Sequence, residues 1–106
     1  MRAWRFHEPG DIRNLVLEEV PDPESGPDES LVRVETAALN PADRYLVQGQ
    51  YPRAGKPPFT PGRDGAGVVV KPGNSGRFKA GDRVCVLGGL TDISGPGLLA
   101  GCCAVP

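Results

Sequence analysis

Apolar and polar residues alternate most regularly at residues 31–37, where Val32 and Val34 are separated by charged residues. A period of two residues is typical of a strand with one buried face. We therefore predict a strand with Val32 and Val34 facing the core and with Arg33 and Glu35 facing solvent.

Shorter apolar runs, bounded by glycine and proline, predict the remaining strands. These runs are residues 1–6, 15–20, 65–71, 83–87 and 100–105. In the first run Trp4 and Phe6 are predicted to share a face, and in the last run Cys102 and Cys103 to face opposite sides. Many short strands separated by Gly- and Pro-rich turns are typical of a sandwich or a barrel.

One segment departs from the strand pattern and predicts a short helix at residues 41–48. Asn40 is a favourable N-cap residue, Pro41 suits the first helical position, and Gly49 suits the C-terminal stop. The chain is therefore predicted to be mainly β with one short helix.

Length and charge exclude several classes of protein. The 106 residues predict one domain, residues 1–106, and 12 Lys and Arg against 13 Asp and Glu give a net charge of −1. No basic stripe indicates nucleic-acid binding, and no apolar run reaches membrane-spanning length. Charged residues stand near the start, where a signal peptide needs its apolar segment, so we expect a cytoplasmic protein with a true start at Met1.

Cysteine and histidine content argues against a metal site. The chain has three cysteines without Cys-x-x-Cys spacing and one histidine, so a four-ligand zinc site would require every one of them. We expect three reduced thiols, and we interpret His7 as a surface residue.

Two nucleotide-binding patterns occur by chance. Residues 95–100 match G-x-G-x-x-G/A, but only six residues follow, which leaves no room for the helix, strand and acidic residue of a dinucleotide site. Residues 49–56 have the wrong glycine spacing for a phosphate loop, and Pro57 stands where a Ser or Thr is needed.

Several segments together resemble one family in order and spacing. Residues 40–45, Asn-Pro-Ala-Asp-Arg-Tyr, resemble its N-P-x-D-x-Y segment, and residues 61–69 resemble its P-G-x-[DE]-x-[AS]-G-V-V block. Residues 17–23, 49–52 and 78–84 match three further segments. The chain thus resembles the GroES-like N-terminal domain of zinc-free medium-chain dehydrogenases/reductases of the quinone oxidoreductase type. The resemblance implies a partly open GroES-like β-barrel, without the Rossmann domain against which it packs in that family.

The resemblance also implies that no catalytic zinc is bound. Zinc-dependent relatives use a Cys, a His and a Glu, and this chain has Asn40, Arg63 and Asp64 at those positions. Asn40 and Arg63 cannot supply a thiolate and an imidazole.

By the same resemblance, Asn40, Tyr45 and Tyr51 are the candidate catalytic residues, and Asn40, Pro41 and Tyr45 are the candidate contacts to the cofactor. An amide NH2 and two phenols are donors suited to an oxygen that becomes negative during reduction. The alternative for Asn40 is a helix cap alone, and for the two tyrosines it is packing with a solvated hydroxyl.

Asp43 and Arg63 are the candidate substrate-pocket residues. Arg63 stands at a former ligand position and offers donors to a substrate oxygen. The alternatives are structural: Asp43 favours the first turn of the helix, and Arg63 pairs with Asp43 or Asp64.

The implied function is the catalytic-domain portion of an NAD(P)H-dependent quinone or enone oxidoreductase acting on a small molecule. NADPH is the implied cofactor, but the chain alone is expected neither to bind it nor to be active. It is expected to form homo-oligomers, because an apolar face near Tyr45, Leu46 and Val47 would be uncovered. The alternative is a stand-alone, non-catalytic GroES-like binding or assembly module.

Overall fold

The computed structural model describes residues 1–51, 56–88 and 97–106. Its six described strands are β1 (Arg2–Arg5), β2 (Val16–Glu19), β3 (Ser30–Ala38), β4 (Asp64–Lys71), β5 (Arg83–Val86) and β6 (Cys102–Val105). Its described helices are a 3-10 turn, η1 (Ile12–Asn14), and α1 (Pro41–Val47). The predicted strands and the predicted short helix are thus confirmed, while η1 was not predicted.

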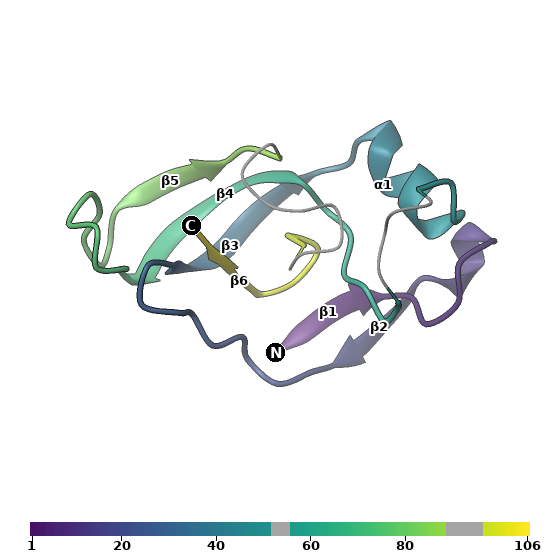
Figure 1. Ribbon diagram of the computed structural model, residues 1–106, viewed down its shortest axis with the longest axis horizontal. Helices are drawn as coiled ribbons and strands as arrows, with labels where there is room; N and C mark the ends of the chain where they lie inside the picture. Colours follow the sequence, from purple (N-terminus) through teal and green to yellow (C-terminus); the bar gives the residue numbers. More distant parts are fainter. Residues whose placement is uncertain (52–55, 89–96) are drawn as a thin grey trace.

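The described strands form two antiparallel sheets. One has the order β5-β4-β3-β6, and the other is the ribbon β1-β2. Isolated bridges Ala3–Ala100 and Phe6–Phe59 connect the ribbon to the rest of the molecule. Figure 1 shows β3 and β4 as long curved strands, with α1 at one end and the β4–β5 connection at the other. The two sheets do not close on each other, as expected of a partly open barrel.

The larger core cluster packs on one face of the four-stranded sheet. Its buried members are Val32, Val69, Val86, Leu98, Cys103 and Val105. Val34 packs against this cluster, while Arg33 and Glu35 are exposed, so the predicted alternation along β3 is confirmed. Cys103 is buried and Cys102 is partly exposed on the opposite face, also as predicted.

A second cluster joins α1 to the ribbon. Phe6, Leu46 and Val47 are its buried members, and the rings of Phe6 and Phe59 lie 5.7 Å apart. The prediction of an uncovered face at Leu46 and Val47 was therefore wrong, because aromatic residues from two other segments cover it. Of that face, Tyr45 alone is exposed.

The prediction for β1 was also wrong in one respect. Trp4 is 43% exposed whereas Phe6 is 1% exposed, so the two side chains do not share a face. The ribbon pairing ends at Arg5, and Phe6 instead bridges to Phe59. This change of partner interrupts the alternation that the sequence suggested.

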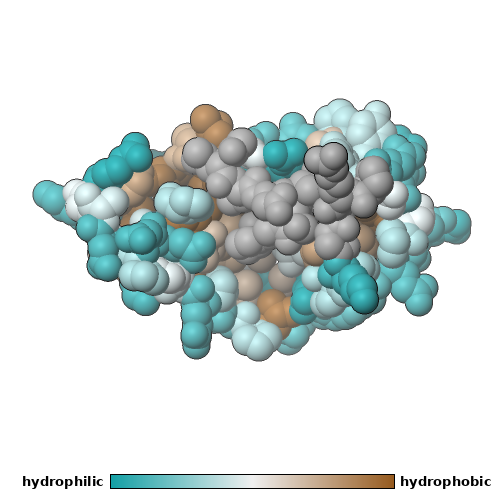
Figure 2. Space-filling view, viewed as in Figure 1, coloured by the Kyte–Doolittle hydropathy of each residue, from teal (hydrophilic) through white to brown (hydrophobic). Residues whose placement is uncertain are grey.

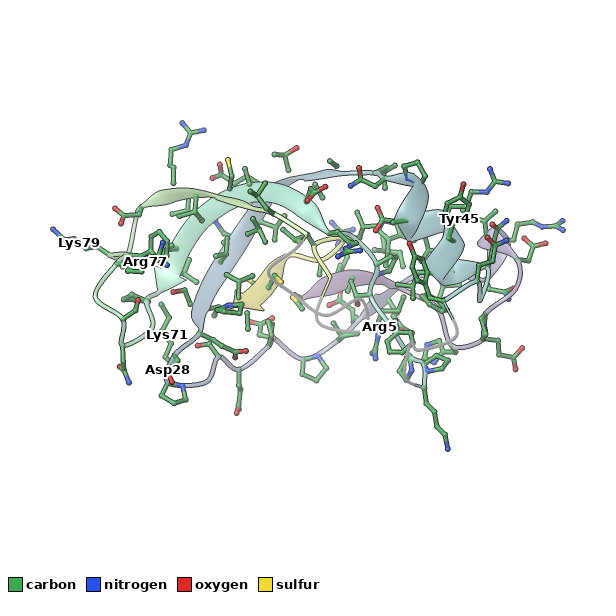
Figure 3. All side chains as sticks on the ribbon, turned by 45° about the horizontal axis from the view of Figure 1, so that its top comes forward. Arg5, Asp28, Tyr45, Lys71, Arg77 and Lys79 are labelled. Atoms are coloured by element: carbon green, nitrogen blue, oxygen red, sulfur yellow. The ribbon has the colours of Figure 1, made fainter. Side chains whose placement is uncertain are left out.

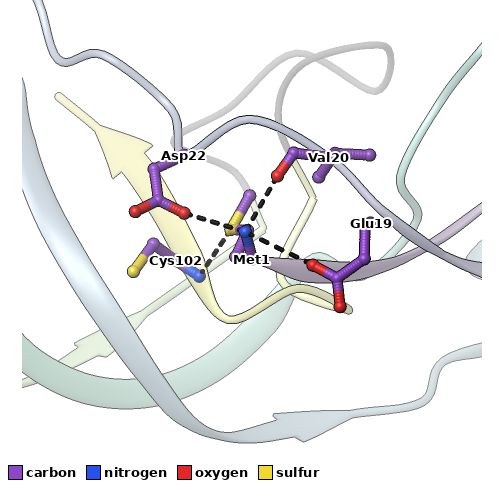
Figure 4. Close-up of polar contacts among 5 residues, drawn as sticks. All are labelled: Met1, Glu19, Val20, Asp22 and Cys102. Carbon is purple, nitrogen blue, oxygen red and sulfur yellow. Dashed lines mark hydrogen bonds and ion pairs between the residues drawn. The ribbon is translucent and has the colours of Figure 1, made fainter.

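Both ends of the chain meet at the ribbon. The Met1 ammonium group donates to the Val20 carbonyl over 2.8 Å and to Asp22 over 3.0 Å (Figure 4). The Met1 sulfur accepts a hydrogen bond from the Cys102 backbone N–H at 3.2 Å. These contacts fasten the start of β1 to the exit of β2 and to the start of β6.

The visible surface is hydrophilic at both ends of the molecule, with apolar patches between them (Figure 2). Within the described residues, no helix is long and apolar enough to cross a membrane.

Candidate functional site

The entry to α1 brings the first candidate residues together. Asn40 is extended at the N-cap position, Pro41 begins the helix, and the Asp43 carboxylate accepts the Asn40 backbone N–H over 2.8 Å. The helix ends at Val47, one residue before the predicted limit, and Gly49 follows with a φ of 76°. Glycine adopts that left-handed conformation without the clash that a Cβ causes, so the predicted stop is confirmed.

Asp43 is a buried carboxylate that binds backbone. It is 6% exposed, and its second oxygen accepts the Gly62 N–H over 2.9 Å. Asp43 thereby ties the first turn of α1 to the segment that leads into β4. Both oxygens serve the fold, which matches the structural alternative given above.

The sheet brings Asn40, Asp64 and Gly88 into contact. Asp64 opens β4 opposite Ala38, near the end of β3, and β5 ends beside the next residue of β4. The Asn40 side-chain NH2 donates to Asp64 Oδ2 over 2.8 Å, and the Gly88 N–H donates to Asp64 Oδ1 over 2.7 Å. One carboxylate therefore joins the exits of two strands to the start of a third.

Arg63 lies beside this group but forms no ion pair with Asp43 or Asp64. Its guanidinium donates to the Gly88 carbonyl, and the ion pairs among the described residues do not include it. The structural alternative, an ion pair of Arg63 with Asp43 or Asp64, was wrong, because both carboxylates already accept backbone or amide donors. A guanidinium has five N–H donors, so Arg63 retains several for another partner.

These residues surround an open pocket of about 380 Å³. Its lining consists of Asn40, Pro41, Ala42, Arg63, Asp64 and Gly88. A second hollow of about 200 Å³, almost entirely apolar, shares Asn40 with it and is walled by residues such as Leu15, Leu39 and Leu99. Asn40 thus stands between a polar pocket and an apolar one.

The two tyrosines line neither of these pockets. Tyr45 is 44% exposed on α1, at the opposite end of the molecule from Lys71, Arg77 and Lys79 (Figure 3). Tyr51 is half-buried against the cluster of Phe6, Leu46 and Val47. In this chain, Asn40, Pro41 and Arg63 come together, whereas Tyr45 and Tyr51 stand apart from them.

The polar side chains of the pocket are an amide, a guanidinium and one carboxylate. No group of three or more His, Cys, Asp or Glu side chains suited to a metal ion occurs among residues 1–51, 56–88 and 97–106. Cys85 is exposed, Cys102 half-buried and Cys103 buried, and His7 is exposed with Glu18 at 3.0 Å. Burial raises the pKa of the Cys103 thiol to about 11.

The described part of the chain does not fit a whole dinucleotide. Every described strand pair is antiparallel, whereas the pyrophosphate site of a Rossmann fold needs a parallel strand–helix–strand unit. Leu98 and Leu99 lead into β6 and not into a helix, which supports rejecting the fingerprint match. The first two residues of that match, and residues 52–55 of the rejected phosphate loop, lie outside the described residues.

Sequence reasoning missed three residues of the pocket, Ala42, Asp64 and Gly88. Asp64 was noted as a former ligand position and as a possible partner of Arg63, whereas in the structure it accepts a hydrogen bond from the Asn40 amide. Gly88 gave no signal, since it follows a strand in a Gly-rich loop. Only the three-dimensional structure shows that Gly88 leaves room for Arg63, because a Cβ at Gly88 would lie 2.7 Å from the Cβ of Arg63.

Comparison with known proteins gives consistent matches. Residues 26–104 match the alcohol dehydrogenase GroES-like domain family. The chain is 44% identical over 82 residues to an alcohol dehydrogenase of Schizosaccharomyces pombe, a match that covers 76% of this chain and 23% of that protein. It is 41% identical over 87 residues to the chloroplastic NADPH-dependent alkenal/one oxidoreductase of Arabidopsis thaliana, covering 79% of this chain and 22% of that protein.

A solved structure agrees with these matches. The quinone oxidoreductase of Pseudomonas syringae is similar with a TM-score of 0.86 and 32% identity, over 99% of this chain and 31% of that one. The chain spans about a quarter of the length of the curated relatives that it matches.

Proposed function

Because this chain belongs to the alcohol dehydrogenase GroES-like domain family, we propose that it is the substrate-facing domain of a zinc-independent, NADPH-dependent oxidoreductase that reduces a quinone or an enone. The resemblance drawn from the sequence segments is confirmed at the level of the family and of its partly open GroES-like fold. Quinone and alkenal/one oxidoreductases are among the similar proteins, and they motivate the choice of substrate.

The observation that carries the proposal is the open pocket at Asn40, Arg63 and Asp64. Reduction of a quinone or an enone places negative charge on an oxygen, which needs either a metal or hydrogen-bond donors. Here an amide and a guanidinium line the pocket, and the one carboxylate already accepts two hydrogen bonds. This pocket therefore offers hydrogen-bond donors, from Asn40 and Arg63, for a substrate oxygen.

Each candidate residue has a proposed part. Asn40 and Arg63 donate to the substrate oxygen, and the apolar hollow beside Asn40 takes part of the hydrocarbon body. Pro41 and Tyr45 contact the nicotinamide end of the cofactor, whose remaining contacts are supplied by residues beyond this chain. Tyr51 and Asp43 have supporting parts. Tyr51 packs against the buried residues of α1, and Asp43 fixes the start of that helix through its two backbone hydrogen bonds. A cytoplasmic location is part of the same proposal.

The test is to join the chain to the cofactor-binding half of a quinone oxidoreductase relative and to assay NADPH-dependent reduction of a quinone and an enone. The expected result is turnover without added metal that a chelator leaves unchanged. A joined protein that binds NADPH but reduces neither compound would favour the non-catalytic binding or assembly module.

A further inference from the structure

Asp64 is the only side chain with hydrogen bonds to two of the other residues that line the polar pocket, among the residues described. Its Oδ2 accepts from the Asn40 amide at 2.8 Å and its Oδ1 accepts from the Gly88 N–H at 2.7 Å. Both bonds are partly buried, which strengthens them relative to the same bonds in water. The Gly88 N–H thus fixes one oxygen of the Asp64 carboxylate, and the other oxygen binds the Asn40 amide.

This arrangement decides which way the Asn40 amide points. An ionised carboxylate accepts hydrogen bonds and donates none, so Asn40 must turn its NH2 toward Asp64 and its oxygen away. The reversed amide would place its oxygen against a negative oxygen. The NH2 carries two hydrogens, and Asp64 uses one, which leaves the other for a ligand in the pocket that Asn40 lines.

We propose that Asp64 is a positioning residue that holds the Asn40 amide in one orientation, so that its second NH2 hydrogen is presented to the substrate oxygen. The catalytic part of this statement rests on the proposed function, whereas the orientation rests on the hydrogen bonds alone. Gly88 acts with Asp64, because its N–H fixes the carboxylate and its missing side chain leaves room for Arg63.

The first experiment needs neither cofactor nor substrate. In 15N-labelled chain, exchange of the Asn40 side-chain amide protons with water is compared with that of the exposed Asn74. A hydrogen bond to a charged acceptor predicts exchange about tenfold slower for the bonded Asn40 proton. Equal exchange rates for Asn40 and Asn74 in the unsubstituted chain would overturn the proposal without any variant.

Substitutions then locate the cause. Asp64→Ala is expected to remove the protection of Asn40, and Asp64→Glu to keep part of it, because the carboxylate remains. Asp82→Ala is the matched control, since Asp82 also accepts a backbone N–H, from Lys79 in the β4–β5 connection. Protection that persists in a folded Asp64→Ala chain would exclude Asp64 as the residue that orients Asn40.

The functional part is tested in the joined protein. Asp64→Ala is expected to lower kcat about tenfold or more while the KM for NADPH stays nearly constant, with partial rescue in Asp64→Glu. An unchanged kcat in Asp64→Ala would refute the catalytic part. If the unsubstituted joined protein is itself inactive, the proposed function fails, while the amide-exchange result still decides the positioning of Asn40.

Discussion

The Asn40 amide and the Asp64 carboxylate, 24 residues apart in the chain, are joined by a hydrogen bond of 2.8 Å. Both stand at positions where zinc-dependent relatives, by resemblance, have metal ligands. In this chain the two side chains satisfy each other, and the adjacent Arg63 bonds to the Gly88 carbonyl.

We expect the purified chain to hold no zinc. A neutral amide and a guanidinium stand at two of the three ligand positions, and neither replaces a thiolate or an imidazole. Elemental analysis after dialysis against zinc measures this directly. One tightly held zinc per chain would contradict the proposed zinc-independent chemistry.

In the joined protein, Asn40→Ala is expected to lower the rate of substrate reduction more than the stability. Loss of one aimed donor costs about 3 kcal/mol of transition-state stabilisation, whereas loss of an N-cap side chain costs about 1 kcal/mol of folding free energy. Single-turnover kinetics and thermal unfolding give the two numbers, with Asn74→Ala as the surface control. A normal rate with a lowered melting temperature would show that Asn40 only caps the helix.

Asp43→Ala is expected to destabilise the chain by about 2–4 kcal/mol, because it leaves two backbone N–H groups without their acceptor. Those groups belong to Asn40 and Gly62. Urea unfolding measures the loss, and Asp82→Ala, which removes an exposed acceptor, is expected to cost less than about 1 kcal/mol. Equal losses in the two variants would mean that burial of Asp43 is unimportant.

The three thiols are expected to react in order of exposure. Cys85 is exposed, whereas burial raises the pKa of Cys103 to about 11, so at pH 8 a thiol reagent should modify Cys85 first and Cys103 last. Mass spectrometry of partly alkylated chain gives the order. Faster modification of Cys103 than of Cys85 in folded protein would contradict the burial of β6.

The same shift predicts a loss of stability in alkali. The folded state favours the neutral Cys103 thiol over the thiolate. The contribution of this thiol to the free energy of unfolding is therefore fully present below about pH 9 and is lost as the pH rises toward 11. Urea unfolding across this range, compared with Cys103→Ala, isolates the effect. The variant should show the smaller decrease in stability above pH 9.

The chain by itself is expected to have no reductase activity, to lack measurable affinity for NADPH and to self-associate. It has no described parallel strand–helix–strand unit for the pyrophosphate.

Ile12 and Leu39, which are 50% and 77% exposed, border an apolar hollow that favours association. Trp4 and nicotinamide fluorescence during an NADPH titration, together with light scattering, test both points. Saturable micromolar binding or a monodisperse monomer would contradict them.

Sequence patterns predicted most of the fold, because its strands carry local signals. The alternation at Val32 and Val34 and the Asn40, Pro41 and Gly49 signals around α1 each act over a few residues. The orientation of Phe6 and the covering of Leu46 and Val47 could not be predicted in this way. They depend on Phe59, more than ten residues after the helix, and no periodicity encodes that contact.

The site was predictable only in part, for the same reason. Asn40 and Arg63 were found through their place in recognisable segments. The bond from Asn40 to Asp64 depends on how β3, β4 and β5 end at one edge, and that edge exists only after the sheet has formed. Gly88 belongs to the site through the space that its missing side chain leaves, which composition does not reveal.

The position of β6 has a consequence for synthesis on the ribosome. β3 lies between β4 and β6 in the sheet, yet β6 follows it by more than sixty residues. Leu98, Cys103 and Val105 complete the larger core cluster, and all three are translated after β3, β4 and β5. Until they leave the exit tunnel, β3 has no strand partner on the side of β6, so Val32 cannot be fully buried before β6 has emerged.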